Sequence, residues 1–241
     1  MNKQNFENYL KLKGLAESSV RKYAIQAPTR IFKEISRDMY EIDDLDELGE
    51  LLLVVKKMES LMEKDPKRMY SAAVSNYIKF ISSRNEVIFD RTDYDFENEV
   101  QGLVAKNSEI RWTEGPQPVV RKVEGLKSYY ARNPLVGARG LALAGYQCAV
   151  NEGHETFVAR ASGKPYMEAH HLVPISYQPL FEHGIDVVEN ISCLCPCCHR
   201  LLHYGTPVVR DSVIEGLFDK QVDGFERVGI EITKKELKTL Y

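Results

Sequence analysis

Histidine and cysteine side chains, which are common ligands of transition metals, crowd into one stretch of this 241-residue chain, between positions 148 and 203. His199 and His203 are four residues apart, so on a helix both imidazoles would lie on one face, within reach of a common ion. Gly205 provides an end for such a helix. Because many helices carry two histidines at this spacing by chance, the pair indicates a metal site only together with further ligands.

A strand that ends at Pro174 is predicted for "YMEAHHLVP", residues 166–174, because the segment alternates and is rich in β-formers. His170 and His171 are neighbours on it and would point to opposite faces. One of them can bind a metal while the other presents its ring to another partner. Glu168 lies two residues before His170, on the same face. We expect Glu168 to hydrogen-bond the second ring nitrogen of His170, as metal-bound histidines usually require.

Four of the five cysteines lie within six residues, in "CLCPCC". Cys195 and Cys198 form a C-x-x-C pair, which is typical of half of a zinc site. Cys193 or Cys197 could substitute in the other, less certain half of such a site, or could be small residues with no metal role. A cysteine cluster beside histidines indicates metal binding rather than a disulfide framework.

The segment between residues 119 and 145 is basic, with a single acidic residue, Glu124. Such a strip could contact the phosphates of a nucleic acid, although a solvated helix face is the alternative for each residue. The strip consists of Arg121, Lys122, Lys127, Arg132 and Arg139.

The string "EAHHLVP … EN … LCPCCHRLLH" resembles the HNH, or ββα-metal, nuclease motif. It is most similar to the motif of restriction endonucleases that begin with E-x-H-H and end with C-P-x-C-H-R-x-x-H. The resemblance covers about residues 130–210 and implies a phosphodiesterase that acts on double-stranded DNA. Some restriction enzymes of this family cut only modified DNA, and nothing in the residues reports on base modification.

Phosphodiester hydrolysis needs an activated water, charge relief on the phosphorane and help for the departing 3′-oxygen. A divalent ion can supply the last two, and a neutral histidine can supply the first. By the resemblance, His171 is the general base, Asn190 orients His171 or joins the metal shell, and Arg200 clamps a phosphate. The resemblance gives the ligands of the catalytic ion as His170, His199 and His203. Three imidazoles suit Mn²⁺, Co²⁺, Ni²⁺ or Zn²⁺ better than Mg²⁺, which prefers oxygen ligands, but the sequence leaves the choice of ion open.

The sequence departs from the family pattern upstream, where a second C-x-x-C is usual. Here only Cys148 is found, followed six residues later by His154. We expect His154 to replace the missing cysteine, so that Cys148, His154, Cys195 and Cys198 bind a structural zinc ion. Bound zinc would supply folding energy that a small module with short strands lacks.

The helical patterns and the family resemblance together imply an α+β fold, with an N-terminal helical bundle followed by a ββα-metal nuclease domain with a structural zinc. Residues 1–90 have amphipathic helical patterns. Within them, "FENYLKLKGLAESSVRKYA" and "YSAAVSNYIKFI" resemble the N-terminal core-binding (SAM-like) domain of phage-type integrases, which implies a module that grips DNA. A bundle that dimerises or only packs is the alternative.

The helical pattern is expected to break at about residue 85, and Gly115, Pro116 and Pro118 are typical of a linker. We therefore predict a linker over residues 91–125. Residues 126–241 would form the nuclease domain together with a C-terminal extension.

The net charge is −3, so the chain as a whole is not a basic nucleic-acid binder. It contains no apolar run long enough for a membrane helix, and its polar start lacks a signal peptide. We therefore expect a cytoplasmic protein without membrane contact. The favoured interpretation is a metal-dependent restriction endonuclease that acts as a homodimer, because cutting both strands needs two active sites.

Two other classes of function compete with this interpretation. One is a zinc-stabilised DNA-binding module without catalysis, which would have no use for the histidine set. The other is a nuclease of a different kind, either a non-specific toxin or a nickase. A recombinase, suggested by the N-terminal part, would need a catalytic domain for which the nuclease leaves no room.

Overall fold

The structure is a computed structural model that describes residues 2–62, 68–106, 111–124, 127–130 and 132–241, with the side chains of residues 84–94 and 122–129 outside the description. The chain divides into two compact units, Met1–Val87 and Ile88–Tyr241, and each is described by itself. The predicted boundaries at residues 90 and 125 stay a prediction.

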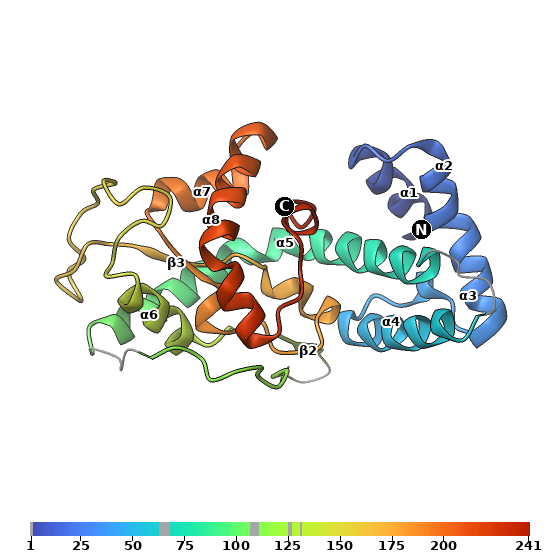
Figure 1. Cartoon of the computed structure of the whole chain (residues 1–241), viewed down its shortest axis with the longest axis horizontal. Helices are drawn as coiled ribbons and strands as arrows, with labels where there is room; N and C mark the ends of the chain where they lie inside the picture. The colour runs from blue at the N-terminus through green and yellow to red at the C-terminus, as the bar shows by residue number, and fades with distance from the viewer. Residues whose placement is uncertain (1, 63–67, 107–110, 125–126, 131) are drawn as a thin grey trace. The chain divides into compact units, whose positions relative to one another are not determined.

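The unit Met1–Val87 consists of helices around an aromatic core. Phe6 lies at the centre of this core, with its ring centroid 5.2 Å from that of Tyr77 and 5.7 Å from that of Phe80. Asp44 caps helix α4 (Leu45–Ser60), because its side chain accepts two backbone N–H groups of the first turn. The elements are α1 (Asn2–Leu12), α2 (Glu17–Arg21), the π-helix η1 (Lys22–Gln26), α3 (Ala27–Ile35), η2 (Met39–Glu41), α4 (Leu45–Ser60) and the first part of α5 (Met69–Val104) (Figure 1).

Helix α5 continues to Val104, so the expected break at about residue 85 is wrong. Between residue 85 and Val104 the sequence contains no proline, and its first glycine is Gly102, so nothing in this segment stops the helix. Phe96, Val100 and Val104 recur every four residues and are buried, which gives this part of α5 an apolar face for the core of the second unit.

The unit Ile88–Tyr241 contains two small antiparallel sheets. Strands β1 (Lys122–Glu124) and β2 (Lys127–Tyr129) pair with each other. Strands β3 (Glu168–His171) and β4 (Ile191–Leu194) pair so that His171 lies opposite Ile191. Helix α6 (Pro134–Leu143) packs on β4 at Gly140, where a Cβ atom would collide with the side chain of Ile191. Glycine at this position therefore lets the helix approach the strand closely.

The chain continues from β4 into helix α7 (Pro196–Tyr204), so that β3, β4 and α7 form a ββα unit. Cys195 caps α7 by accepting the N–H of Cys198 on its sulfur. Helix α8 (Pro207–Val228) follows and ends at Gly229, which adopts a positive φ of 75°. The short 3₁₀ elements η3 (Ile175–Leu180) and η4 (Val188–Asn190) lie between the strands, and α9 (Lys234–Lys238) lies near the C-terminus.

The predicted α+β class is confirmed, with helices in the N-terminal part and a small two-stranded sheet beside α7. Among the described residues, no helix is both long and apolar enough to cross a membrane.

Candidate metal centres and active site

Two groups of side chains that could each hold a metal ion meet at helix α7. The helix is labelled in Figure 1. Cys195 and Cys198 lie at its start, and His199 and His203 lie on its next two turns. The helix therefore contributes donors to both groups, with Cys198 and His199 adjacent in the chain. We call the first group the thiol cluster and the second the imidazole cluster.

The thiol cluster brings together Cys148, His154, Cys195 and Cys198, with all donor atoms within 4.8 Å of one another. The Nδ1 atom of His154 lies 3.6 Å from the sulfur of Cys195 and 3.4 Å from that of Cys198. Three sulfurs and one imidazole match the donor set of a structural zinc site. The four residues that the sequence assigned to this site could therefore hold zinc.

The electrostatics of the thiol cluster also fit a cation. Burial raises the pKa of the Cys148 thiol, but the backbone N–H groups of Cys195, Asn151 and Val150 and the ring of His154 outweigh it and lower the pKa to about 7. Burial, followed by the neighbouring Cys195, raises the pKa of Cys198. Crowded sulfurs cannot all ionise without a positive charge between them, and a divalent ion would provide that charge.

The other two cysteines lie outside the thiol cluster. Cys193 is buried on β4, and this burial raises the pKa of its thiol to about 12. Cys197 is exposed on α7. The alternative in which one of them replaces Cys148 or His154 therefore has no support from the geometry.

The imidazole cluster consists of His170 from β3 and of His199 and His203 from α7, with donor atoms within 4.8 Å of one another. The Nε2 atoms of His199 and His203 are 3.2 Å apart. Burial, followed by the neighbouring rings of His199 and His203, holds the pKa of His170 well below its usual value. A neutral imidazole keeps a lone pair for a metal, so this donor set fits a divalent transition-metal ion.

The outer partners of the imidazole cluster differ from the expected ones. Glu168 bonds His199, with 2.7 Å between Oε2 and Nδ1, and not His170 as expected. Residues two apart on a strand share a face but are separated by roughly 7 Å, so the carboxylate meets the helix that packs across the strand. The Nε2 atom of His170 lies 2.7 Å from the hydroxyl of Tyr241, which donates to the carbonyl of Leu172 at 2.8 Å.

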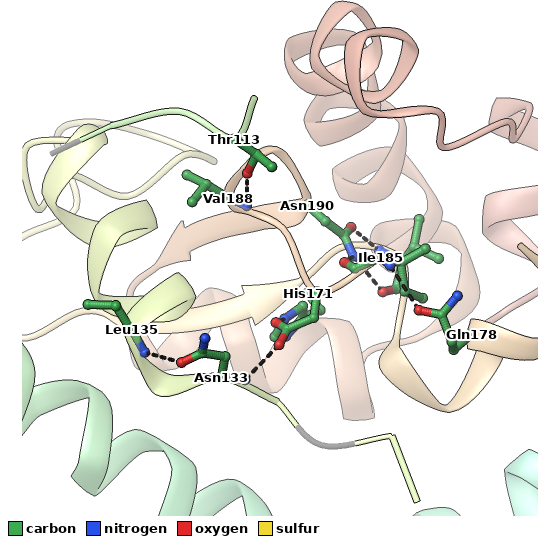
Figure 2. Close-up of polar contacts among 10 residues, drawn as sticks. Thr113, Asn133, Leu135, His171, Gln178, Ile185, Val188 and Asn190 are labelled. Atoms are coloured by element: carbon green, nitrogen blue, oxygen red, sulfur yellow. Dashed lines mark hydrogen bonds and ion pairs between the residues drawn. The ribbon is translucent and has the colours of Figure 1, made fainter. Parts of the chain in front are cut away.

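His171 has a half-buried carboxylate partner, Asp186, that the sequence did not reveal. Its Nε2 atom lies 2.9 Å from Oδ1 of Asp186, and Oδ2 of Asp186 accepts the backbone N–H of Asn133 at 2.7 Å. Asn133 in turn caps helix α6 through Leu135 (Figure 2). The carboxylate thus holds the ring of His171 through Nε2.

Asn190 is fully buried, and its amide is engaged with the loop that follows β3. Its oxygen accepts the N–H of Val173 at 2.7 Å, and its nitrogen donates to the carbonyls of Val173 and Ile185, each at 2.9 Å (Figure 2). These bonds close the loop that carries Asp186. The structure does not place the Asn190 amide on His171, so its role at that ring or in the metal shell stays a prediction.

Four of the six predicted DNA-contacting side chains are described, and their contact with DNA stays a prediction. Arg121 and Arg200 are exposed, with guanidinium groups about 6 Å from the rings of Tyr130 and Tyr204. Arg132 and Arg139 instead line a cavity of about 740 Å³. The side chains of Lys122 and Lys127 lie outside the described residues.

Comparison with known proteins agrees with this geometry. Residues 153–205 match the family model of the HNH endonuclease. Over 83 residues, or 34% of the chain, the sequence is 39% identical to the type IV methyl-directed restriction enzyme EcoKMcrA of Escherichia coli (strain K12). The match spans 28% of that relative, so the chain spans well under two thirds of its length. The resemblance of residues 1–90 to integrases stays a prediction. Residues 153–205 of this chain are therefore an HNH endonuclease domain.

Proposed function

We propose that this chain is a metal-dependent DNA endonuclease of the restriction type, which hydrolyses phosphodiester bonds with His171 as general base. The observation that carries the proposal is the pair of His171 and Asp186, next in the chain to His170 of the imidazole cluster. A zinc-binding module without catalysis would need neither the oriented His171 nor a second group of metal donors.

His170, His199 and His203 would hold the catalytic ion, and that ion would supply charge relief at the phosphate and at the departing 3′-oxygen. His171 accepts the proton of the attacking water on Nδ1, while Asp186 holds the ring through Nε2 and stabilises the imidazolium that forms. Arg200, exposed on α7, binds a phosphate oxygen. The imidazole donors favour Mn²⁺, Co²⁺, Ni²⁺ or Zn²⁺ over Mg²⁺.

The thiol cluster has a structural role in this proposal. A zinc ion on Cys148, His154, Cys195 and Cys198 fixes the start of α7, and the next residue, His199, begins the catalytic donor set. A displacement of about 1 Å in a catalytic group can lower the reaction rate strongly. By fixing the start of α7, the structural ion would keep His199 in the position that catalysis requires.

The substrate class follows from the domain and from its relative. The substrate is double-stranded DNA, and modified DNA is the first form to test because the relative is named as methyl-directed. The biological role is defence against foreign DNA in the cytoplasm. A homodimer would supply one active site for each strand.

The decisive experiment compares wild type with His171→Ala and Asp186→Asn in cleavage of methylated and unmethylated plasmid with Mn²⁺, Ni²⁺ or Mg²⁺. Loss of a general base predicts at least a hundredfold decrease in rate for His171→Ala. Asp186→Asn keeps the shape but not the charge, and is expected to lower kcat about tenfold to a hundredfold with KM unchanged. His183→Ala is the matched control, since His183 belongs to neither cluster.

Each outcome selects one function. Cleavage at defined positions that is lost in His171→Ala supports a restriction enzyme, and cleavage everywhere or of one strand only indicates a toxin nuclease or a nickase. If no substrate is cut while zinc and DNA binding persist, the chain is a binding module and the proposal is wrong.

A further inference from the structure

The cavity of about 740 Å³ lies wholly within the unit Ile88–Tyr241. Its walls come from the segment 111–120, from the start of α6 and from the loop 184–188. None of these segments belongs to the ββα unit that carries the metal donors. The size of the cavity falls within the range of sites for small organic ligands, about 300–1,000 Å³.

Hydrogen bonds hold the segment 111–120 against residues 184–189, so this wall of the cavity has a defined position. Thr113 donates its N–H to Glu189 at 3.0 Å. Its hydroxyl accepts the N–H of Val188 at 3.2 Å (Figure 2). The N–H of Gly184 donates to the carbonyl of Gln117 at 2.8 Å. A Cβ atom on Gly184 would lie 2.6 Å from the backbone oxygen of Pro118, so only glycine permits this close approach.

The cavity shares a wall with the general base. Asp186 lines it and at the same time holds Nε2 of His171. Arg132 also lines it, with a guanidinium 4.4 Å from the ring of Phe96, whose centroid lies 5.9 Å from that of His171. A nucleotide bound in the cavity would therefore lie close to His171.

The lining groups match the two chemical halves of a nucleotide. Arg111, Arg132 and Arg139 supply guanidinium groups for a phosphate. The Nε atom of Arg139 is buried and has no hydrogen-bond partner in the part of the chain that the structure describes, whereas buried donors are normally paired. An anionic oxygen entering the cavity would provide the missing acceptor.

Trp112 could contact the other part of a nucleotide, its base. It lines the cavity, is 55% exposed, and lies 5.5 Å from the guanidinium of Arg227. An exposed indole at a site with several arginines is typical of a platform on which a base stacks.

We infer that this cavity binds one nucleotide of the cleaved strand, next to the scissile phosphate, with its phosphate on Arg132 and Arg139 and its base stacked on Trp112 outside the duplex. The inference rests on the proposed function, since the ligand is the strand that His171 attacks. It adds a substrate-binding site outside the matched residues 153–205.

The chain contains a single tryptophan, so its tryptophan fluorescence reports on Trp112 alone. The probe is a short duplex across a mapped cleavage position, mixed with His171→Ala so that it stays intact. We expect the duplex to quench Trp112 emission, and the same duplex with an abasic site beside the cut to bind without quenching. Binding itself is followed by the anisotropy of a dye on the DNA.

Two substitutions and their controls complete the test. Arg139→Ala is expected to raise the Kd of the duplex about tenfold, as for loss of a charge-assisted hydrogen bond, whereas Arg160→Ala, exposed and outside the cavity, should leave it unchanged. In cleavage assays, Trp112→Ala should raise KM about tenfold through lost stacking. Phe157→Ala, an exposed aromatic outside the cavity, should not.

These measurements distinguish a failure of the cavity inference from a failure of the proposed nuclease function. If His171→Ala abolishes cleavage while Trp112→Ala cuts with wild-type KM, or if bound duplex leaves Trp112 emission unchanged, the cavity inference is wrong and the proposed function stands. If no duplex is cut, titration of wild type with thymidine 5′-monophosphate against inorganic phosphate still decides. Quenching by the nucleotide alone, weakened in Arg139→Ala, supports a nucleotide site, and its absence contradicts one.

Discussion

The thiol cluster and the imidazole cluster lie on the same helix, yet their surroundings differ. The thiol cluster offers four donors, three of them on buried cysteines. The imidazole cluster offers three donors, and His203 is exposed. Four protein donors close a tetrahedral site, whereas three leave a position for water or substrate. By donor count, the first cluster fits a structural ion, and the second fits the catalytic ion of the proposed function.

The outer contacts sharpen this difference. The carboxylate of Glu168 and the hydroxyl of Tyr241 each bond a histidine of the imidazole cluster. Such partners orient ligands and tune a metal, which matters for a reacting ion more than for one that only crosslinks the chain. The thiol cluster is supported instead by backbone N–H groups, such as that of Cys198 on the sulfur of Cys195.

The largest effect is expected from Cys198→Ser, which removes a donor of the structural ion. Loss of a structural metal should lower the free energy of unfolding by more than about 4 kcal/mol, because zinc binding in such sites is folding energy. Thermal melts followed by circular dichroism, with zinc content measured on the same samples, check this. Cys197→Ser is the matched control, since its exposed side chain is next in the chain but outside the cluster. Equal melting temperatures for the two variants would contradict a structural role for the ion in the thiol cluster.

The second effect concerns catalysis alone. His203→Ala takes one donor from the imidazole cluster at an exposed position. We expect cleavage to fall at least a hundredfold, because the catalytic ion provides several kcal/mol of charge stabilisation, while the melting temperature and the tightly held zinc stay at wild-type values. A variant that loses both zinc and stability would show that the two clusters do not divide structure from chemistry.

Local geometry predicted the donors of both clusters that lie on or beside α7, and the family resemblance supplied the rest. A C-x-x-C turn and an i, i+4 histidine pair bring side chains together within one helix, as for Cys195 with Cys198 and His199 with His203. The α+β class could be predicted from the same patterns. Cys148 and His154 were expected only through the missing second cysteine pair, and the structure does bring their donor atoms to the cluster.

The residues that the sequence did not reveal depend on contacts between distant segments. Asp186 is one acid among many in the sequence, and only the fold of the loop after β3 brings it to His171. The partner of Glu168 depends on how α7 packs across β3, which residue spacing does not define. The cavity requires the segment 111–120 to dock on the loop 184–188, a contact between positions more than sixty residues apart.

A smaller effect is expected from Glu168→Gln, which keeps the shape of the side chain but removes its charge. The carboxylate lies 2.7 Å from Nδ1 of His199, so its loss should weaken binding of Mn²⁺ or Ni²⁺ about tenfold to a hundredfold. Isothermal titration of the zinc-loaded protein measures this affinity, and the structural zinc should be unaffected. An unchanged affinity would mean that Glu168 is a structural contact and not a support for the metal.

The smallest effect is expected from Tyr241→Phe. The hydroxyl bonds both His170 and the carbonyl of Leu172, but it carries no charge, so its loss should weaken metal binding by about tenfold at most, at the low end for an outer partner. The same titration measures it, with Tyr204→Phe as control, because Tyr204 is exposed on α7 and neither cluster contains it. If Tyr241→Phe costs more than Glu168→Gln, the hydroxyl orients His170 more strongly than the carboxylate orients His199. The hydrogen-bonded Tyr241, and not the charged Glu168, would then be the principal outer support of the catalytic ion.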